Sequence, residues 1–201
     1  ANLGTTHHSI EDIGMLSTIS NLNIICPADQ KELMKLLPQI IKSKKPTYLR
    51  LGKKNENLIY KKDCKSKLGK IEIIKKGKEI CIFGMGNILH NAILAYKYLK
   101  VDVQPQIINV HTIKPLDKKG ILKNLKRFKK IIILEEHMDT GGLSTKIKNI
   151  CSENHINNKI ICHNTGNKFL VGLGDKLNTR KILKLDPISI KKSILRLKKI
   201  Q

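Results

Sequence analysis

The sequence predicts an α/β protein with mostly parallel sheets, in which an incomplete first domain precedes a complete second one. Short apolar runs such as EICIFGMG and KIIILEE alternate with longer amphipathic stretches that have helical spacing. This alternation is typical of parallel sheets, in which helices connect successive strands. Residues 53–70 are polar and charged with little periodicity, so they predict an exposed linker between the two domains.

Residues 1–52 predict part of a parallel sheet domain. A short helix over 10–16 precedes the strand LNIICPAD, which ends at Pro27. Asp29 is then placed to cap a helix over 31–44, and PTYLRLG forms the next strand. Because two strands do not make such a sheet, this segment is expected to be about half of its domain.

Residues 71–201 predict a complete doubly wound sheet with helices on both faces. IEIIKKG and EICIFGMG form either a hairpin or two consecutive strands, followed by the helix NILHNAILAYKYLK and the strand PQIINVHTI. The remaining elements are a helix from about Asp117, the strand KIIILEE, a helix after Gly142, the strand KIICHN and a terminal helix with Pro187 in its first turn.

Composition excludes a membrane span and argues against nucleic-acid binding. No apolar run approaches the roughly 20 residues that a membrane helix needs, and no segment has the pattern of a signal peptide. The net charge is +23, but the lysines are spread along the chain and aromatic residues are only 3%, so stacking platforms for bases are scarce. Five cysteines without metal-ligand spacing predict free thiols in a reducing cytoplasm.

His7 and His8 stand next to each other ahead of the first helix and its acidic pair, Glu11 and Asp12. Adjacent side chains in an extended turn point in different directions, and no third ligand is spaced for a metal, so a metal site is not expected. Imidazoles suit hydrogen bonds to a hydroxylated, anionic substrate. Arg50 is the sole arginine of the first domain in a chain that otherwise prefers lysine, and its planar fork suits a phosphate or carboxylate.

Two further motifs leave alternatives open. Gly84 and Gly86 follow a strand and open a helix, which fits a phosphate cradle, but without a third glycine a tight turn is the better interpretation. Glu135, Glu136 and His137 end a strand before a glycine pair. They are either catalytic or part of a contact between domains or subunits at the edge of the sheet.

Four motifs in order resemble the transketolase family of thiamine-diphosphate enzymes. GTTHHSIEDIGMLSTISNLNIICPAD and KPTYLRLG are similar to the later part of the family's pyrimidine-binding domain, and INVHTIKPLD and IILEEHMDTGGL are similar to its C-terminal domain. The resemblance covers nearly all of the chain. It implies that residues 1–52 are the C-terminal part of the pyrimidine-binding domain, 53–70 the linker and 71–201 the transketolase C-terminal domain.

The resemblance also implies a function and roles for individual residues. The family transfers a two-carbon ketol unit between sugar phosphates, with His7 reaching the sugar's hydroxyl or phosphate, Arg50 binding the phosphate and His8 in a supporting position. Leu3 stands where related long-chain transketolases have an aspartate, which leaves the preferred sugar open.

The cofactors implied by the resemblance are thiamine diphosphate and Mg²⁺. In the family, the catalytic glutamate lies upstream of the G-x-T-H motif, and another domain binds diphosphate and magnesium. We therefore expect no catalytic, cofactor-binding or metal-binding residue in this chain, and no activity when it is alone. The expected partner is an N-terminal portion or N-terminal transketolase subunit, in a cytoplasmic homo- or heterodimer.

Two alternatives remain on the sequence. The first is a fragment of 1-deoxy-D-xylulose-5-phosphate synthase, in which the same histidine and arginine would hold glyceraldehyde phosphate and a pyruvate-derived fragment would replace the ketose donor. The second is a noncatalytic or RNA-binding basic protein, for which the diffuse lysine charge predicts steep salt sensitivity.

Overall fold

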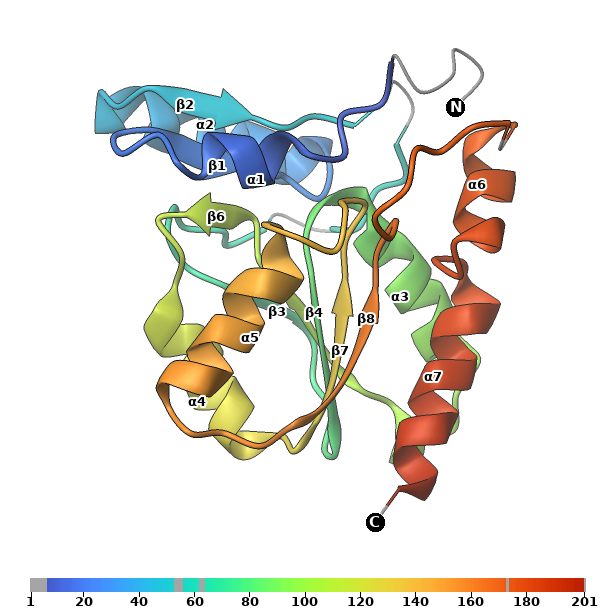
Figure 1. The fold of residues 1–201 in the computed structure, drawn as a ribbon. Helices are drawn as coiled ribbons and strands as arrows, with labels where there is room; N and C mark the ends of the chain where they lie inside the picture. Colours follow the sequence, from blue (N-terminus) through green and yellow to red (C-terminus); the bar gives the residue numbers. More distant parts are fainter. Residues whose placement is uncertain (1–6, 53–55, 62–63, 173, 201) are drawn as a thin grey trace.

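The protein contains one large and one small sheet, stacked end to end (Figure 1). The computed structural model describes residues 7–52, 56–61, 64–172 and 174–200. Both sheets are flanked by helices, as the predicted α/β fold class requires. None of the helices in these ranges is long and apolar enough to cross a bilayer.

The large sheet has five strands in the order β3-β5-β4-β7-β8. The edge strand β3 runs antiparallel to β5, and the other strands are parallel. Because β5 lies between β3 and β4, these two consecutive strands do not form a hairpin. The strands are β3 (Glu72–Lys75), β4 (Ile80–Gly84), β5 (Gln106–Asn109), β7 (Lys130–Leu134) and β8 (Lys159–His163).

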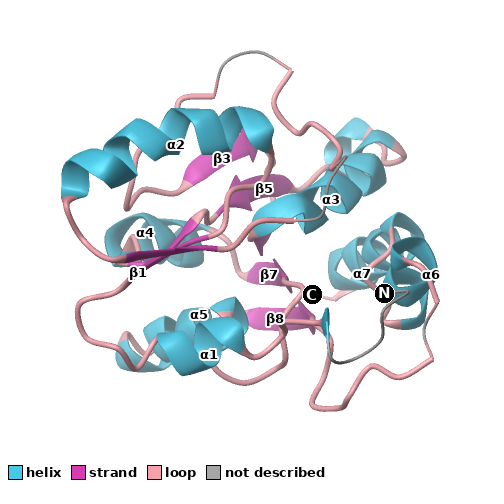
Figure 2. Ribbon diagram, turned by 90° about the horizontal axis from the view of Figure 1, so that it is seen from above, coloured by secondary structure: helices cyan, strands magenta, loops and turns pink. Residues whose placement is uncertain are grey.

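Helices cover both faces of the large sheet, which confirms the doubly wound arrangement (Figures 1 and 2). One face packs against α3 and α7, through a core that includes Ile82, Leu89 and Ile194. The other packs against α4 and α5, through a core that includes Phe83 and Ile147. The helices are α3 (Leu89–Lys97), α4 (Lys118–Arg127), α5 (Leu143–Glu153) and α7 (Pro187–Lys199), with short 3-10 turns η2 (Gly86–Ile88) and η3 (Val101–Val103).

The small sheet has the order β2-β1-β6, and each of its strands is three residues long. Strands β1 (Asn23–Ile25) and β2 (Thr47–Leu49) are parallel, and β6 (Thr112–Lys114) runs antiparallel to β1. Helices α1 (Asp12–Leu16) and α2 (Gln30–Ser43) lie on opposite sides of β1 (Figure 2). As predicted, Asp29 caps α2, and its Oδ1 accepts a hydrogen bond from Glu32 N at 2.9 Å.

The predicted strand PQIINVHTI is instead two strands in two different sheets. Val110 N donates to Gly84 O in the large sheet (2.8 Å), whereas the next carbonyl, His111 O, accepts from Cys26 N in the small one (2.7 Å). The polypeptide therefore changes sheets within two residues. Strand β6, from the second half of the chain, completes the small sheet of the first.

The segment predicted to be an exposed linker is partly packed against the protein in its described part. Ile59, Tyr60 and Ser66 are buried. Asp29 Oδ2 accepts from the backbone amides of both Ile59 (2.7 Å) and Tyr60 (2.9 Å), and Ser66 Oγ donates to Glu32 Oε1 (2.6 Å). The prediction of exposure is wrong at these three residues, because polar groups of this segment satisfy buried acids at the start of α2.

One helix was not predicted: α6 (Lys176–Ile182). It has only seven residues, which is too short for a helical hydrophobic period to stand out. Asp175 caps it, since its Oδ1 accepts from Asn178 N at 2.8 Å. This helix proves to be one wall of the larger cavity described below.

Candidate functional site

A cavity of about 570 Å³ opens where the small sheet meets the loops that follow β7 and β8. These loops lie at the carboxyl ends of parallel strands, where α/β sheets usually bind ligands. The structure brings all three predicted substrate-binding residues into the wall of this cavity, together with polar residues of the second half of the chain: His7, His8, Arg50, Glu136, Thr165 and Arg180.

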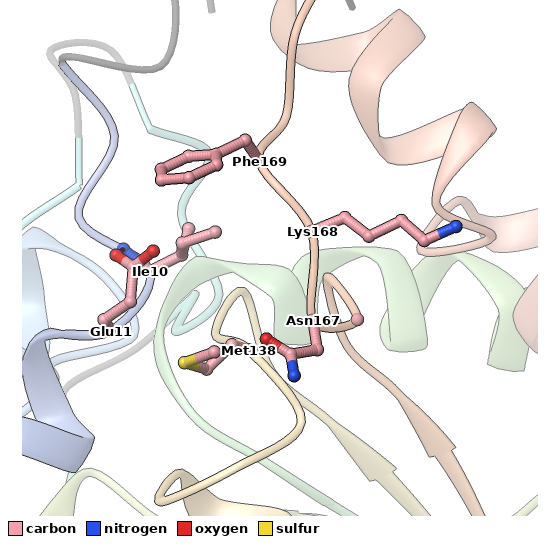
Figure 3. Close-up of a pocket in the computed structure, with 7 residues that line it drawn as sticks. Ile10, Glu11, Met138, Asn167, Lys168 and Phe169 are labelled. Carbon is pink, nitrogen blue, oxygen red and sulfur yellow. Dashed lines mark hydrogen bonds between the residues drawn. The ribbon is translucent and has the colours of Figure 1, made fainter.

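A second hollow of about 250 Å³ also has Ile10 in its lining. Figure 3 shows Ile10, Met138 and Phe169 around it, with the Lys168 side chain directed away. Its acidic residue, Glu11, already accepts a hydrogen bond from Ile10 N at 3.2 Å. Because ligand sites need convergent polar groups as well as apolar surface, the larger cavity is the better candidate.

Arg50 is held in place by three hydrogen bonds. Its Nε donates to Asp12 Oδ2 (2.8 Å), and its Nη2 donates to the carbonyls of Ser9 (2.6 Å) and Glu136 (2.9 Å). The Tyr48 hydroxyl also donates to Asp12 Oδ2 at 2.8 Å. The guanidinium thus connects the end of β2 both to the segment before α1 and to the loop after β7, and its charge is compensated by Asp12.

His137 and two glycines form a second contact between the two halves of the chain. Gly14 N donates to His137 Nε2 (3.3 Å), so the ring proton lies on Nδ1, which donates to Met138 O (2.9 Å). A Cβ atom on Gly141 would lie 2.7 Å from Gly14 Cα, and Gly141 has a φ of +79°. Only glycine allows both this backbone conformation and this close approach.

The two glutamates before His137 have structural partners in the second domain. The carboxylate of Glu135 is fully buried and accepts from the amides of Leu143 (2.7 Å) and Ser144 (3.0 Å) at the start of α5. Burial raises the pKa of Glu135, against the lowering effect of these hydrogen bonds. These contacts favour the structural interpretation of Glu135 and His137 over the catalytic one.

Glu136 forms a bidentate ion pair with Arg180 of α6, in which both nitrogen–oxygen distances are 2.7 Å. Burial alone would raise the pKa of Glu136, but the hydrogen bonds and charge of Arg180 hold it below its ordinary value. Lys176 of the same helix pairs with Glu56. The cavity wall is therefore rich in charges, but these charges are paired.

The histidine pair lies at the cavity with unequal exposure. His7 is exposed, while His8 is half-buried. The Nδ1 atom of His8 is buried without a hydrogen-bond partner in the described part of the chain. The residues just before them, Gly4 to Thr6 of the predicted motif and Leu3, lie outside the described residues.

Gly84 and Gly86, the candidate phosphate cradle, do not line either of these cavities. A Cβ on Gly84 would come within 2.6 Å of the Leu89 side chain, and Gly86 has a φ of +70°. Gly86 thus serves a tight turn, which was the favoured interpretation, and Gly84 leaves room for the Leu89 side chain.

Sequence reasoning missed Thr165 and Arg180 in the cavity wall. Arg180 carried the same signal as Arg50, since arginine is rare in this chain: only four of its 39 basic residues are arginines. Nothing in the sequence around Thr165 marks it, because its position depends on how β8 ends beside the small sheet.

Comparison with known proteins identifies the family. The model of the transketolase pyrimidine-binding domain matches residues 1–57, and the model of the transketolase C-terminal domain matches residues 69–164. The chain belongs to the transketolase family. This confirms the predicted family and, with the two sheets described above, the predicted fold class. The two transketolase domains also imply dependence on thiamine diphosphate.

Two curated relatives come from different branches of the family. One subunit of the apulose-4-phosphate transketolase of Phocaeicola vulgatus is 32% identical over 161 residues, which is 79% of this chain and 52% of the relative. The 1-deoxy-D-xylulose-5-phosphate synthase of Clostridium botulinum is 32% identical over 204 residues, which is 96% of this chain and 31% of the relative. The chain thus spans about half of the transketolase relative and about a third of the synthase.

Two solved structures share the fold. A split gene transketolase, solved as an inactive beta4 tetramer, has a TM-score of 0.84 at 19% identity, and the match covers 96% of this chain and 62% of that protein. Transketolase from Campylobacter jejuni has a TM-score of 0.67 at 15% identity, and the match covers 98% of this chain and 29% of that protein. At these identities the likeness concerns the fold alone.

Within the described ranges, no three His, Cys, Asp or Glu side chains gather as they would around a metal ion.

Proposed function

We propose that this chain is part of a transketolase-type transferase that moves a two-carbon ketol unit between sugar phosphates. Its role is to supply substrate-binding residues and the C-terminal domain. The observation that carries the proposal is the cavity, which gathers His7, His8 and Arg50 from two separate segments beside polar residues of the C-terminal domain. Such a cavity between two domains, with a few convergent polar groups, suits a small polar substrate.

In this proposal the two histidines bind the substrate directly, and Arg50 has two tasks. His7 is exposed at the cavity and hydrogen-bonds a hydroxyl or phosphate oxygen, with His8 behind it. The Nε and Nη2 atoms of Arg50 hold the wall together. Its remaining amino group, Nη1, forms no bond with any described residue and is the donor left for a phosphate.

We propose that a partner subunit holds most of the thiamine diphosphate and Mg²⁺ site and supplies the catalytic glutamate. Bound thiamine diphosphate supplies the carbanion chemistry of the reaction. The names of the relatives, a subunit of one transketolase and a split gene transketolase, support a divided enzyme. So do the large apolar side chains that α1 and α2 expose: Met15, Met34 and Ile41. By this proposal the chain is inactive alone and works as a homo- or heterodimer.

We expect the protein to act in the cytoplasm, because a reducing compartment keeps its cysteines, all free in the structure, as thiols.

A synthase of the 1-deoxy-D-xylulose-5-phosphate type is the second candidate. It is favoured by the length of the similarity to the Clostridium botulinum synthase, 96% of this chain. The two candidates differ in the donor, which is a ketose phosphate in the first and pyruvate in the second. The same cavity would bind the phosphorylated acceptor in both.

The test is to purify the chain with its partner subunit, load it with thiamine diphosphate and Mg²⁺, and assay both reactions. Transfer from a ketose phosphate to an aldose phosphate supports the first candidate, and condensation of pyruvate with glyceraldehyde phosphate supports the second. His7→Asn should lower kcat/KM by roughly 10- to 100-fold, the value of a hydrogen bond to a charged group.

His155→Asn is the matched control, because His155 is exposed at the end of α5 and lines neither cavity. Its kcat/KM should equal that of the wild type. Equal losses in both variants, or no reaction of either type with the wild type, would contradict the proposal.

A further inference from the structure

Two polar atoms in the wall of the large cavity are buried and have no hydrogen-bond partner among the described residues. They are Nδ1 of His8 and Oγ1 of Thr165, one from each half of the chain. The Thr165 residue is only 6% exposed. Buried polar groups are nearly always paired in native proteins, so an unpaired hydroxyl and an unpaired imidazole nitrogen in one cavity wall need an explanation.

The backbone of Thr165 is fixed, but its side chain is not held by any polar contact with the described residues. Thr165 N donates to His137 O at 3.0 Å, which anchors the residue just after β8. Its hydroxyl can be turned by rotation about χ1, since threonine has more than one favourable rotamer. A hydroxyl can both donate and accept a hydrogen bond. Thr165 is therefore positioned to pair with a group that enters the cavity.

The charges around Thr165 indicate which kind of group this is. On α6, Arg180 is paired with Glu136 and Lys176 with Glu56. An anion bound there would have to compete with these carboxylates, whereas the phosphate of the substrate has Nη1 of Arg50 as its donor. A neutral hydroxyl would not, and it would match both unpaired atoms, because it can donate to His8 Nδ1 or bond with the hydroxyl of Thr165.

We propose that Thr165 is a specificity-determining residue, whose hydroxyl binds a hydroxyl group on the carbon chain of a phosphorylated sugar opposite His8. The C-terminal domain then takes part in choosing the substrate as well as in supporting the fold. This inference rests on the proposed function of the same cavity, and it adds a residue and a domain to it.

The experiment compares Thr165→Val with Thr165→Ser in the enzyme loaded with its partner subunit and cofactors. Valine has nearly the same shape as threonine without the hydroxyl. Because that hydroxyl is buried and unpaired in the free protein, Thr165→Val should raise Tm by roughly 2–4 °C. It should also abolish the preference of the enzyme for an aldose phosphate over one of its monodeoxy analogues, a preference expected to be about tenfold in kcat/KM. Thr165→Ser should retain this preference.

The matched control is Thr145→Val on α5, because Thr145 lines neither cavity. The Thr145 hydroxyl already accepts from Gly141 N at 3.0 Å and donates to Asp139 O at 3.3 Å, so this substitution should lower Tm and leave the preference among deoxy analogues unchanged. The same replacement at two threonines thus has opposite expected effects on Tm.

The outcomes distinguish the role of Thr165 from the proposed function of the cavity. A wild-type enzyme that acts on sugar phosphates, with Thr165→Val as selective as the wild type towards every deoxy analogue, would overturn the role of Thr165 alone. A lower Tm for Thr165→Val would do the same, since it would mean a structural role. A wild-type enzyme that neither binds nor converts sugar phosphates would overturn the proposed function and this inference with it.

Discussion

The two sheets of this protein differ in how they are stabilised. In the large sheet, β4 and β5 are buried along their whole length, and helices cover both faces. In the small sheet, each strand has three residues and one of the three strands comes from the other domain. Its helix α2 buries Leu36 on one side, yet exposes Met34 and Ile41 at 62% and 70%. The large sheet has its own core, whereas the small one depends on its neighbours.

This difference shows that the small sheet depends on the junction, and we propose that the junction also has a functional role. The small sheet is joined to the large one by β6, by the Gly14 and Gly141 contact, and by the bonds of Arg50. The same junction contains the cavity with His7 and His8. Substitutions at the junction should therefore affect the small sheet first, and the proposed substrate site with it.

The largest effect is expected for Gly141→Ala. The new Cβ would lie 2.7 Å from Gly14 Cα, and the residue has a left-handed backbone conformation. The strain and the clash together should reduce the free energy of unfolding by about 3 to 4 kcal/mol. Chemical denaturation measures this, and hydrogen exchange should locate the loss in β1 and β2.

Gly166→Ala separates the backbone strain from the steric clash. Gly166 has nearly the same φ, +71°, but nothing lies within 4 Å of a Cβ placed on it. The free energy of unfolding of this variant should fall by only about 1 kcal/mol, which is the cost of the backbone conformation. Equal losses in the two variants would mean that the approach of Gly14 to Gly141 contributes nothing.

His111 lies where the chain crosses between the sheets, and it is expected to make the free energy of unfolding depend on pH by about 3 kcal/mol. Burial lowers the pKa of His111 from 6.5 to about 4. The folded protein therefore binds fewer protons than the unfolded chain between these values, and its stability falls as the pH falls from 6.5 towards 4. His111→Gln, a neutral replacement, should remove this part of the pH dependence. Denaturation of both proteins at several pH values measures it, and parallel curves would contradict the expected burial cost.

The smallest effect is expected for Arg50→Lys, at about 1 to 2 kcal/mol of unfolding free energy. Lysine keeps the charge, but its donors all lie on one nitrogen, which cannot take the places of both Nε beside Asp12 and Nη2 beside the carbonyls of Ser9 and Glu136. Arg196→Lys on the exposed side of α7 should change stability by less than about 0.5 kcal/mol. If the two variants have the same denaturation midpoint, Arg50 does not hold the junction.

The large sheet could be predicted from the sequence much better than the junction. Its strands and the caps of its helices follow from local patterns, such as Asp186 ahead of Pro187. The break between β5 and β6 has no local signal, because an uninterrupted apolar run is divided by hydrogen bonds to two different sheets. Arg50 could be selected because it is rare, but its partner Asp12 lies 38 residues away and was not predicted. No sequence pattern identifies Thr165 as a site residue, and only its place in the folded cavity wall does.

By our proposal, the two halves of the chain form one substrate cavity at their junction. Hydrogen exchange of the assembled, cofactor-loaded enzyme, with and without a ketose phosphate, can decide this. We expect the substrate to slow exchange on both sides of the cavity, in residues 7–12 and in residues 164–170 and 176–183. Slower exchange in the first of these segments alone would contradict the claim, because the C-terminal domain would then be a support with no part in binding.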